Sequence, residues 1–532
     1  MSLSRGRLDT IPSANVAEGW TLSRVSHPSR LHGANGLRTG PDGRIYVAQV
    51  PGSSISAIDP DSGAVETICA IDGPVTAPDD LVFDEHGNMF ITEVTLGKVS
   101  MLSADGAYRV VNGAMPVANP ITMHEGRLIA GECRPDGRVM ELDKDTGAER
   151  LILENAPMPN AFTVGPDGKL YMPMMAVNEI WRIDLQGGDH EVVAGDLGVP
   201  DSVKFDSKGR IVSTQVASGD VLRIDPQTGE REVLATVAPG LDNCTFVGDR
   251  LFVSSISGQV NEVLSDGTTK NLVPDGLQWP MGLALGEDGS LFIADGAYSY
   301  LVDPDGTRQT IGFLFYPGYP GFARGVAADG PGQWLTTNAG GQVMRWNLAS
   351  QESEVVAEGF EVLFGVTRAQ DGSAIFADGA AGRVLHATNG SVEELASGLD
   401  RPMGVAVSSG GKVFVSENRA GRVVSIKGGA TETVIDGLRE PQGIAIHADR
   451  LFILDVGDRS LVSAALDGSD RQTIASNLPV KAPPGVTPKI LGGVGNLSGP
   501  MESFAGIAVA ADGTIYVSGD AEGSVLSLAP VQ

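Results

Sequence analysis

Cysteine is scarce in this sequence: the 532 residues include only Cys69, Cys133 and Cys244. An odd number of widely spaced thiols argues against a disulfide framework and against a zinc site built from cysteine alone. Long apolar runs are missing as well. No stretch approaches the roughly 18 apolar residues of a membrane span, and Met1–Asn15 lacks the apolar centre of a signal peptide. The sequence therefore predicts a soluble cytoplasmic protein.

Basic and aromatic residues are also in short supply. Lys and Arg total 38 against 66 Asp and Glu, which gives a net charge of −28, and aromatic residues make up 5 % of the chain. Such an acidic surface repels nucleic acid and anionic membranes and favours cations. We therefore expect neither nucleic acid nor a membrane as a partner. The hydrophobic fraction of 42 % is still large enough for a folded core.

Glycine, in contrast, is abundant, with 70 residues beside 31 prolines. Without a collagen-like period, this composition indicates many turns and short strands. A unit of roughly 40 residues recurs along the chain, and one copy reads APDDLVFDEHGNMFITEVTLGKVSMLSADGAYRVV. It holds two apolar strands joined by a hairpin turn, then two strands of increasing polarity. Four short antiparallel strands per unit predict the blade of a β-propeller.

The number of units follows from the residue just before the first strand of each one, which we call the ring position. Twelve units exceed the roughly four to eight blades of one propeller, so the sequence predicts an all-β fold of two tandem six-bladed β-propellers. The ring positions are Asn35, Asp79, Asn119, Asn160, Asp201, Asn243, Met281, Arg324, Phe364, Met403, Gln442 and Ala505.

The domain boundaries follow from the same count. Residues 31–275 are predicted to form the first propeller, and residues 276–532 the second, which contains a Pro/Gly-rich insertion at 478–503. Residues 1–30 form an N-terminal segment. Its stretch GWTLSRVS could close the second ring, whose last unit lacks an outer strand, or could edge the first ring. The insertion and the aromatic loop Gly312–Phe322 are candidate lids; packing between the propellers is the alternative for the loop.

The two predicted rings differ in chemistry. The residue that begins the innermost strand of a blade faces the mouth of the central channel, so six of them surround one point. All six residues of the first ring carry a side-chain oxygen, whereas the second ring is mostly apolar. Converging amide and carboxylate oxygens suit a hard cation such as Ca²⁺. The alternative is that Asn and Asp simply stabilise the turns that begin these strands.

Two stretches, MPNAFTVGPDGKLYM and VPDSVKFDSKGRIV, resemble the senescence-marker-protein/gluconolactonase family of six-bladed propellers over residues 30–275. The resemblance implies a channel-bound Ca²⁺, or another divalent cation such as Mg²⁺, Mn²⁺ or Zn²⁺, with Asn119, Asn160 and Asp201 among its ligands. It also implies that Asp201 acts as base or nucleophile in hydrolysis of a lactone or related ester. Asn35 stands where the family usually has Glu. The second half is similar to NHL-type repeats, RPMGVAV and EPQGIAI, without a metal motif.

Further candidates surround the predicted ring. His32 lies three residues before Asn35 and is a candidate proton shuttle, or else a loop histidine. The carboxylate that is missing at Asn35 could come from Asp79 or Asp80, or from Glu93 or Glu132, which end second strands. Glu132 is also a candidate catalytic residue. Arg134 could bind a substrate carboxylate or lie in a solvated turn. The predicted function is a divalent-metal-dependent hydrolase with a small-molecule substrate. A non-catalytic scaffold and a metal-assisted lyase or isomerase are the alternatives.

Overall fold

The computed structural model describes residues 7, 8, 13–388, 390–494 and 498–531. Within these ranges the chain is built from strands and turns, with one short 3-10 helix, Met175–Val177, and no α-helix. None of the described helices is long or apolar enough to span a membrane. The described part of the N-terminal segment therefore begins at Arg7, and the first six residues of the predicted segment lie outside it.

The repeating unit is a four-stranded antiparallel meander, as predicted. In the second blade its strands are β7 (Pro78–Phe83), β8 (Met89–Glu93), β9 (Lys98–Leu102) and β10 (Tyr108–Asn112), paired in that order. The hairpin between β7 and β8 is set by Asp84, whose Oδ1 accepts the N–H groups of His86 and Asn88 at 3.0 and 2.9 Å. Gly87 there has a φ of 79°, which glycine adopts without strain. The described residues form twelve sheets, eleven of four strands and one to which β1 (Asn15–Val16) adds a fifth, which confirms the propeller fold.

The N-terminal propeller contains residues 30–275 and residues 486–495. Its ring closes where β23 of the sixth blade meets the first blade. Ser254 Oγ donates to the carbonyl of Asn35 at 2.7 Å, and Thr39 Oγ1 donates to the carbonyl of Phe246 at 2.7 Å. The innermost strands are β3 (Leu37–Thr39), β7, β11 (Ala118–His124), β15 (Thr163–Val164), β19 (Pro200–Phe205) and β23 (Leu241–Val247).

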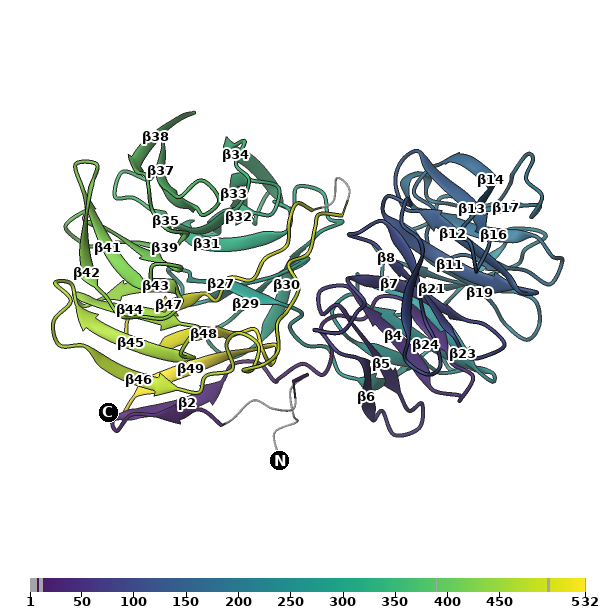
Figure 1. The fold of residues 1–532 in the computed structure, drawn as a ribbon, viewed down its shortest axis with the longest axis horizontal. Coiled ribbons are helices and arrows are strands. Elements are labelled where there is room, and N and C mark those ends of the chain that lie inside the picture. The colour runs from purple at the N-terminus through teal and green to yellow at the C-terminus, as the bar shows by residue number, and fades with distance from the viewer. Residues whose placement is uncertain (1–6, 9–12, 389, 495–497, 532) are drawn as a thin grey trace. The chain divides into compact units, whose positions relative to one another are not determined.

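The C-terminal propeller is closed by the N-terminal segment. Strand β2 (Trp20–Arg24) pairs with β49 (Ser524–Pro530) and completes the twelfth blade, and Figure 1 shows the purple β2 beside β49. Of the two closures that the sequence allows, the chain therefore uses the one on the second ring. The innermost strands are β27 (Pro280–Leu285), β31 (Ala323–Gly330), β35 (Leu363–Arg368), β39 (Pro402–Val407), β43 (Pro441–His447) and β47 (Ile507–Val509).

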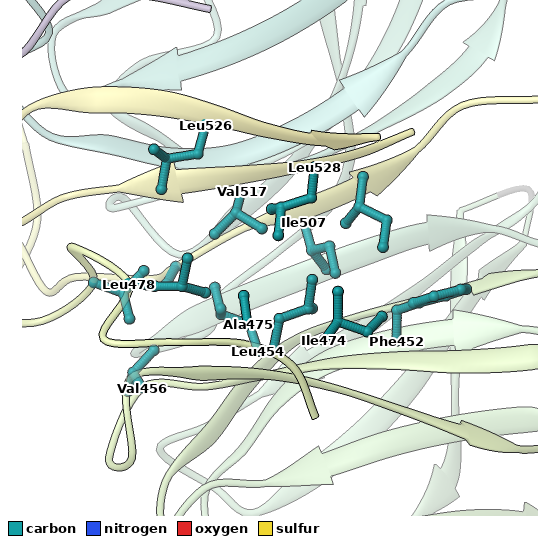
Figure 2. Close-up of a cluster of buried hydrophobic side chains, with 14 residues drawn as sticks. Phe452, Leu454, Val456, Ile474, Ala475, Leu478, Ile507, Val517, Leu526 and Leu528 are labelled. Carbon is teal, nitrogen blue, oxygen red and sulfur yellow. The ribbon is translucent and has the colours of Figure 1, made fainter. Parts of the chain in front are cut away.

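Neighbouring blades are joined by apolar cores. Between the last two blades, Leu454 and Ile474 face Val517, Leu526 and Leu528, as Figure 2 shows. All five side chains are almost fully buried, with at most 3 % of their surface exposed. Burying an aliphatic side chain of this size contributes about 1.5–3 kcal/mol. The closing strand β2 adds Trp20 and Leu22 to the same core.

Different parts of the predicted insertion pack on different propellers. Its middle, residues 486–495, groups with the N-terminal propeller, and we call it the insertion tip. The Lys489 ammonium donates to the carbonyls of Gly73 and Val75. These two residues lie in the connection that leads into β7. The insertion tip therefore packs on the side of the N-terminal propeller where its innermost strands begin.

Candidate functional site

Polar side chains gather where the innermost strands of the N-terminal propeller begin. The first paired residue of such a strand faces the end of the second strand, as Pro200 faces Gln215 and Leu241 faces Ser255. The next residue occupies the ring position, and the equivalent residues of the other blades follow from the same register. The ring is made of Asn35, Asp79, Asn119, Asn160, Asp201 and Asp242.

In the sixth blade the structure places Asp242, and not the predicted Asn243, at the ring position. The N–H of Asn243 donates to Ser254 Oγ at 3.0 Å. The N–H of Ser202, the residue after ring residue Asp201, makes the same bond to Thr214 Oγ1 at 3.2 Å. Asn243 therefore lies one position beyond the ring, where its Oδ1 accepts the N–H of Cys244 at 2.8 Å. Because Asp242 and Asn243 are both polar and adjacent, the sequence alone does not show which of them occupies the ring position.

Hydrogen bonds join neighbouring ring residues. Asn35 Nδ2 donates to Asp242 Oδ2 at 3.1 Å, and Asn160 Nδ2 donates to Asp201 Oδ2 at 2.9 Å. These four side chains are each no more than 8 % exposed. Each pair joins two adjacent blades. The Oδ1 atoms of Asn35 and Asn160 accept the backbone N–H groups of Val50 and Ala161 at 3.1 and 2.8 Å, so these two amides turn their Nδ2 groups toward the carboxylates.

The three ring carboxylates have raised pKa values. Burial is the largest cause for Asp201, and the charges of Asp242 and Asp79 add to it; burial and Asp79 likewise raise the pKa of Asp242 well above its usual range. Burial and the adjacent Asp80 raise the pKa of Asp79 to about 7. Three carboxylates that repel one another, two of them buried, are costly to ionise together unless a cation compensates them.

The ring also leaves an acceptor unused. Asn119 Oδ1 is buried and accepts no hydrogen bond from the described residues. Such an orphaned acceptor calls for a ligand that the protein itself does not supply. Among the described residues, no three His, Cys, Asp or Glu side chains form a metal-binding cluster. The ring instead combines three carboxylates with three amides, side chains whose oxygens suit Ca²⁺ or a similarly hard divalent cation.

The predicted catalytic residue Glu132 occupies a structural position. It is fully buried, and its two carboxylate oxygens accept the Nε groups of Arg134 and Arg138, each at 3.0 Å. Arg134 is therefore held by Glu132, and by Asp136 at 3.0 Å, rather than left to bind a substrate. Both oxygens of Glu132 are engaged, which makes it a poor general base.

In several blades, the residue that ends the second strand braces the connection into the same blade. Glu93 Oε2 accepts the N–H of Thr76 at 2.8 Å, and Gln215 Oε1 accepts the N–H of Gly198 at 2.8 Å. In the C-terminal propeller, Glu417 Oε1 accepts the N–H of Asp400 at 2.8 Å. Because the bond recurs in both propellers, we call these residues the blade braces and assign Glu93 to them, not to the site.

His32 packs within the first blade. Its N–H donates to the brace Gln49, at Oε1, at 2.8 Å, and the side chain is buried. A Cβ on Gly52 would lie 2.7 Å from His32 Nδ1, so Gly52 is needed for the imidazole to fit. The proton-shuttle role of His32 stays a prediction.

The ring of the C-terminal propeller is filled by its own chain. Arg324 is 1 % exposed and donates to the carbonyls of Leu363 and Pro500 at 2.6 and 2.7 Å. Gln442 Oε1 accepts the N–H of Ala505 at 2.7 Å. Phe364 lies against Phe504, with ring centroids 6.1 Å apart. The end of the insertion therefore covers this ring. Its two polar members bond to backbone groups, although Nε of Arg324 is buried without a partner in the described part of the chain.

Two basic side chains of the channel are not among the residues predicted from the sequence. Arg38 on β3 and Lys204 on β19 follow the ring position by three residues in their blades. Both lie on innermost strands, where the sequence reads as an apolar alternation. The signal that could have found them is a charged residue inside such a strand, because charges are rarely buried without a role.

Sequence comparison supports the relationship drawn from the motifs. Residues 20–257 match the model of the family described as SMP-30/Gluconolactonase/LRE-like region, which confirms the resemblance of the first half. A gluconolactonase of Zymomonas mobilis subsp. mobilis (strain ATCC 31821 / ZM4 / CP4) is 27 % identical over 155 residues, which cover 25 % of this chain and 42 % of the relative. The chain thus spans less than half of the relative's length.

Two lyases and a protein described as a putative gluconolactonase are among the similar solved structures. A streptogramin B lyase is 20 % identical, with a TM-score of 0.39, over 52 % of this chain and 97 % of its own. A virginiamycin B lyase from Staphylococcus aureus is 17 % identical, with a TM-score of 0.38, over 52 % of this chain and 96 % of its own. Each covers about the length of one propeller of this protein.

Proposed function

We propose that the N-terminal propeller is a divalent-cation-dependent hydrolase of a lactone or related ester, and that the polar ring is its active site. The observation that carries the proposal is the set of three mutually repelling carboxylates, of which Asp201 and Asp242 are buried and Asp79 is partly buried, beside the orphaned Oδ1 of Asn119. A divalent cation on the channel axis would satisfy both at once. The sequence relationship to a gluconolactonase supports the substrate class.

The ring residues divide the work between binding and proton transfer. Asp79, Asp201, Asp242 and Asn119 would hold the cation. The predicted ligands Asn35 and Asn160 would orient Asp242 and Asp201 through their Nδ2 groups, because their Oδ1 atoms accept backbone N–H groups. When bound, a cation of this kind supplies Lewis-acid polarisation of the ester carbonyl. Asp201 would accept the proton of the attacking water, and its hydrogen bond from Asn160 fixes its orientation. Burial of the ring keeps bulk water away from the reacting groups, which strengthens their electrostatic interactions.

The test is lactone hydrolysis by chelator-treated protein to which Ca²⁺, Mg²⁺, Mn²⁺ or Zn²⁺ is returned. Aldonolactone opening can be followed by the acid released at constant pH. We expect activity to return with one of these ions and Asp201→Asn to reduce kcat at least about a hundredfold. Asp189→Asn, on an exposed loop, is the matched control and should behave as wild type.

Other outcomes separate the alternative functions. Binding of the cation without turnover of lactones or esters would favour a lyase or isomerase on the same ring, which product analysis with hydroxy-acid substrates can detect. Absence of both cation binding and turnover would overturn the proposal. The protein would then be a double propeller whose faces bind a partner.

A further inference from the structure

Below the ring, the channel of the N-terminal propeller contains a buried ammonium group. Lys204 follows Asp201 by three residues on β19 and is 7 % exposed. Its Nζ is buried and makes no hydrogen bond within the described part of the chain. Burial lowers the pKa of Lys204 to about 8. An unpaired buried ammonium is costly, so the surrounding charges have to compensate it.

The charges around Lys204 belong to the same channel. Asp80 and Asp201 act on its ammonium favourably, and Arg38 acts on it unfavourably. Arg38 lies 3.6 Å from Asp80, between Nη2 and Oδ2, and donates to the carbonyls of Leu81 and Ile121 at 2.9 and 3.0 Å. Arg38 therefore reaches across two neighbouring blades. Together, Arg38, Asp80 and Lys204 form a charged layer that interacts with the ring, which we call the inner layer.

The charges of the ring and the inner layer sum to a simple value. The innermost strands of this propeller and their ring positions carry four carboxylates and two cations, apart from His124 at the far end of β11. The carboxylates are Asp79, Asp80, Asp201 and Asp242, and the cations are Arg38 and Lys204. The formal sum is −2, which one divalent cation neutralises. Without Lys204 the sum would be −3.

We propose that Lys204 is a fixed internal cation that sets the charge of the ion accepted by the ring, limiting it to one divalent cation and disfavouring trivalent ions. This inference rests on the proposed function, because it assumes that the ring binds a cation. Lys204 acts through the field in the channel rather than by contact with substrate, and is therefore a positioning residue. In the low-dielectric channel, one unit charge changes the binding of a nearby multivalent ion by about tenfold or more.

The test is a calorimetric titration of the full chain with Ca²⁺ and with Tb³⁺. Wild type is expected to bind one Ca²⁺ per chain and to prefer it to Tb³⁺. Lys204→Met should bind Ca²⁺ at least about tenfold more tightly and should gain still more for Tb³⁺, because the charge deficit then matches a trivalent ion. Lys204→Arg, which keeps the charge, and Lys208→Met, on an exposed turn, should behave as wild type.

The outcomes separate this inference from the proposed function. If wild type binds Ca²⁺ and a folded Lys204→Met variant binds both ions with unchanged or weaker affinity, the role of Lys204 is overturned and the proposed function stands. If wild type binds no divalent cation, both fail together. Should Lys204→Met not fold, Lys204→Gln gives the same comparison with a polar side chain in the same space.

Discussion

The two propellers share one architecture and differ at the ring. In the N-terminal ring, Asp201 and Asp242 are buried with raised pKa values, and Asn119 has an unused acceptor. In the C-terminal ring, Arg324 donates to the carbonyls of Leu363 and Pro500, and Gln442 Oε1 accepts the N–H of Ala505. The first ring contains repelling carboxylates, whereas the second ring is covered by the end of the insertion. The contrast supports the proposal that the N-terminal ring is the one that binds a cation.

The comparison also separates structural from functional carboxylates. Glu93 and Glu417 brace the same place in the two propellers, so the fold alone explains them. Asp242 has its counterpart in Ala505, so the fold does not require an acid there. A residue type that changes between otherwise equivalent positions is the better candidate for function.

The largest effect is expected for Asp242. Replacing it in Asp242→Asn removes one of three ring carboxylates, and divalent-ion affinity should fall by about a hundredfold. Calorimetric titration with Ca²⁺ measures the change. Asn243→Ser is the control, because Asn243 lies one position beyond the ring and its substitution should change the affinity by less than about threefold. A larger loss from Asn243→Ser than from Asp242→Asn would show that the ring is assigned in the wrong register.

Two fully buried glutamates that end second strands provide a test across the two propellers. Glu132→Gln and Glu417→Gln each remove charge from a fully buried carboxylate that is paired with partly exposed arginines. We expect each substitution to destabilise its own propeller by about 1–2 kcal/mol. Thermal unfolding measures this, and catalysis should change less than about twofold for both. Loss of catalysis in Glu132→Gln without loss of stability would make Glu132 catalytic after all.

The cation-free N-terminal propeller should lose stability as the pH is raised. Burial and Asp80 raise the pKa of Asp79 to about 7, so between about pH 4 and pH 7 the folded state keeps a proton that the unfolded state has released. Raising the pH across this window therefore favours unfolding. We expect the Tm of chelator-treated protein to fall by about 2–4 °C or more, and less in Asp79→Asn. A Tm that rises over this window would contradict the assigned burial of the carboxylates.

The smallest effect is expected at the insertion tip. Lys489→Ala removes the ammonium that donates to the carbonyls of Gly73 and Val75. Amide exchange in residues 486–494 should become faster, and KM for the substrate should rise by a few fold with kcat nearly unchanged. Lys427→Ala, at an exposed end of β41 (Arg422–Lys427), is the control. Unchanged exchange and KM would remove the insertion tip from the site.

The fold was predictable from the sequence because each of the repeats contains its own pattern of strands and turns. Hairpin residues such as Asp84 and Gly87 recur with the repeat, so the strands and their number follow from local turn chemistry. The sequence left open whether β2 closes the second ring or forms an edge of the first ring, because the composition of this polar edge strand suits either position. Only its pairing with β49 decides the question.

The candidate site was predictable only in part. Asn160 and Asp201 stand in clear motifs, but the sixth repeat offers Asp242 and Asn243 side by side, and the strand register alone distinguishes them. Glu132 is held in a structural position by Arg138, which lies six residues away on the next strand. No local sequence pattern indicates that these two residues form an ion pair. Arg38 and Lys204 come from different blades, and only the closed ring brings their charges together.

The central claim is that the polar ring binds one divalent cation, and metal content measures it most directly. Purified wild type and the double variant Asp201→Ala, Asn160→Ala should be compared by elemental analysis and by thermal unfolding with and without chelator. The account predicts near-stoichiometric Ca²⁺ or another divalent ion in wild type, lost in the variant, with a Tm that chelator lowers only in wild type. Metal-free wild type whose Tm is indifferent to chelator and to added divalent ions would contradict it.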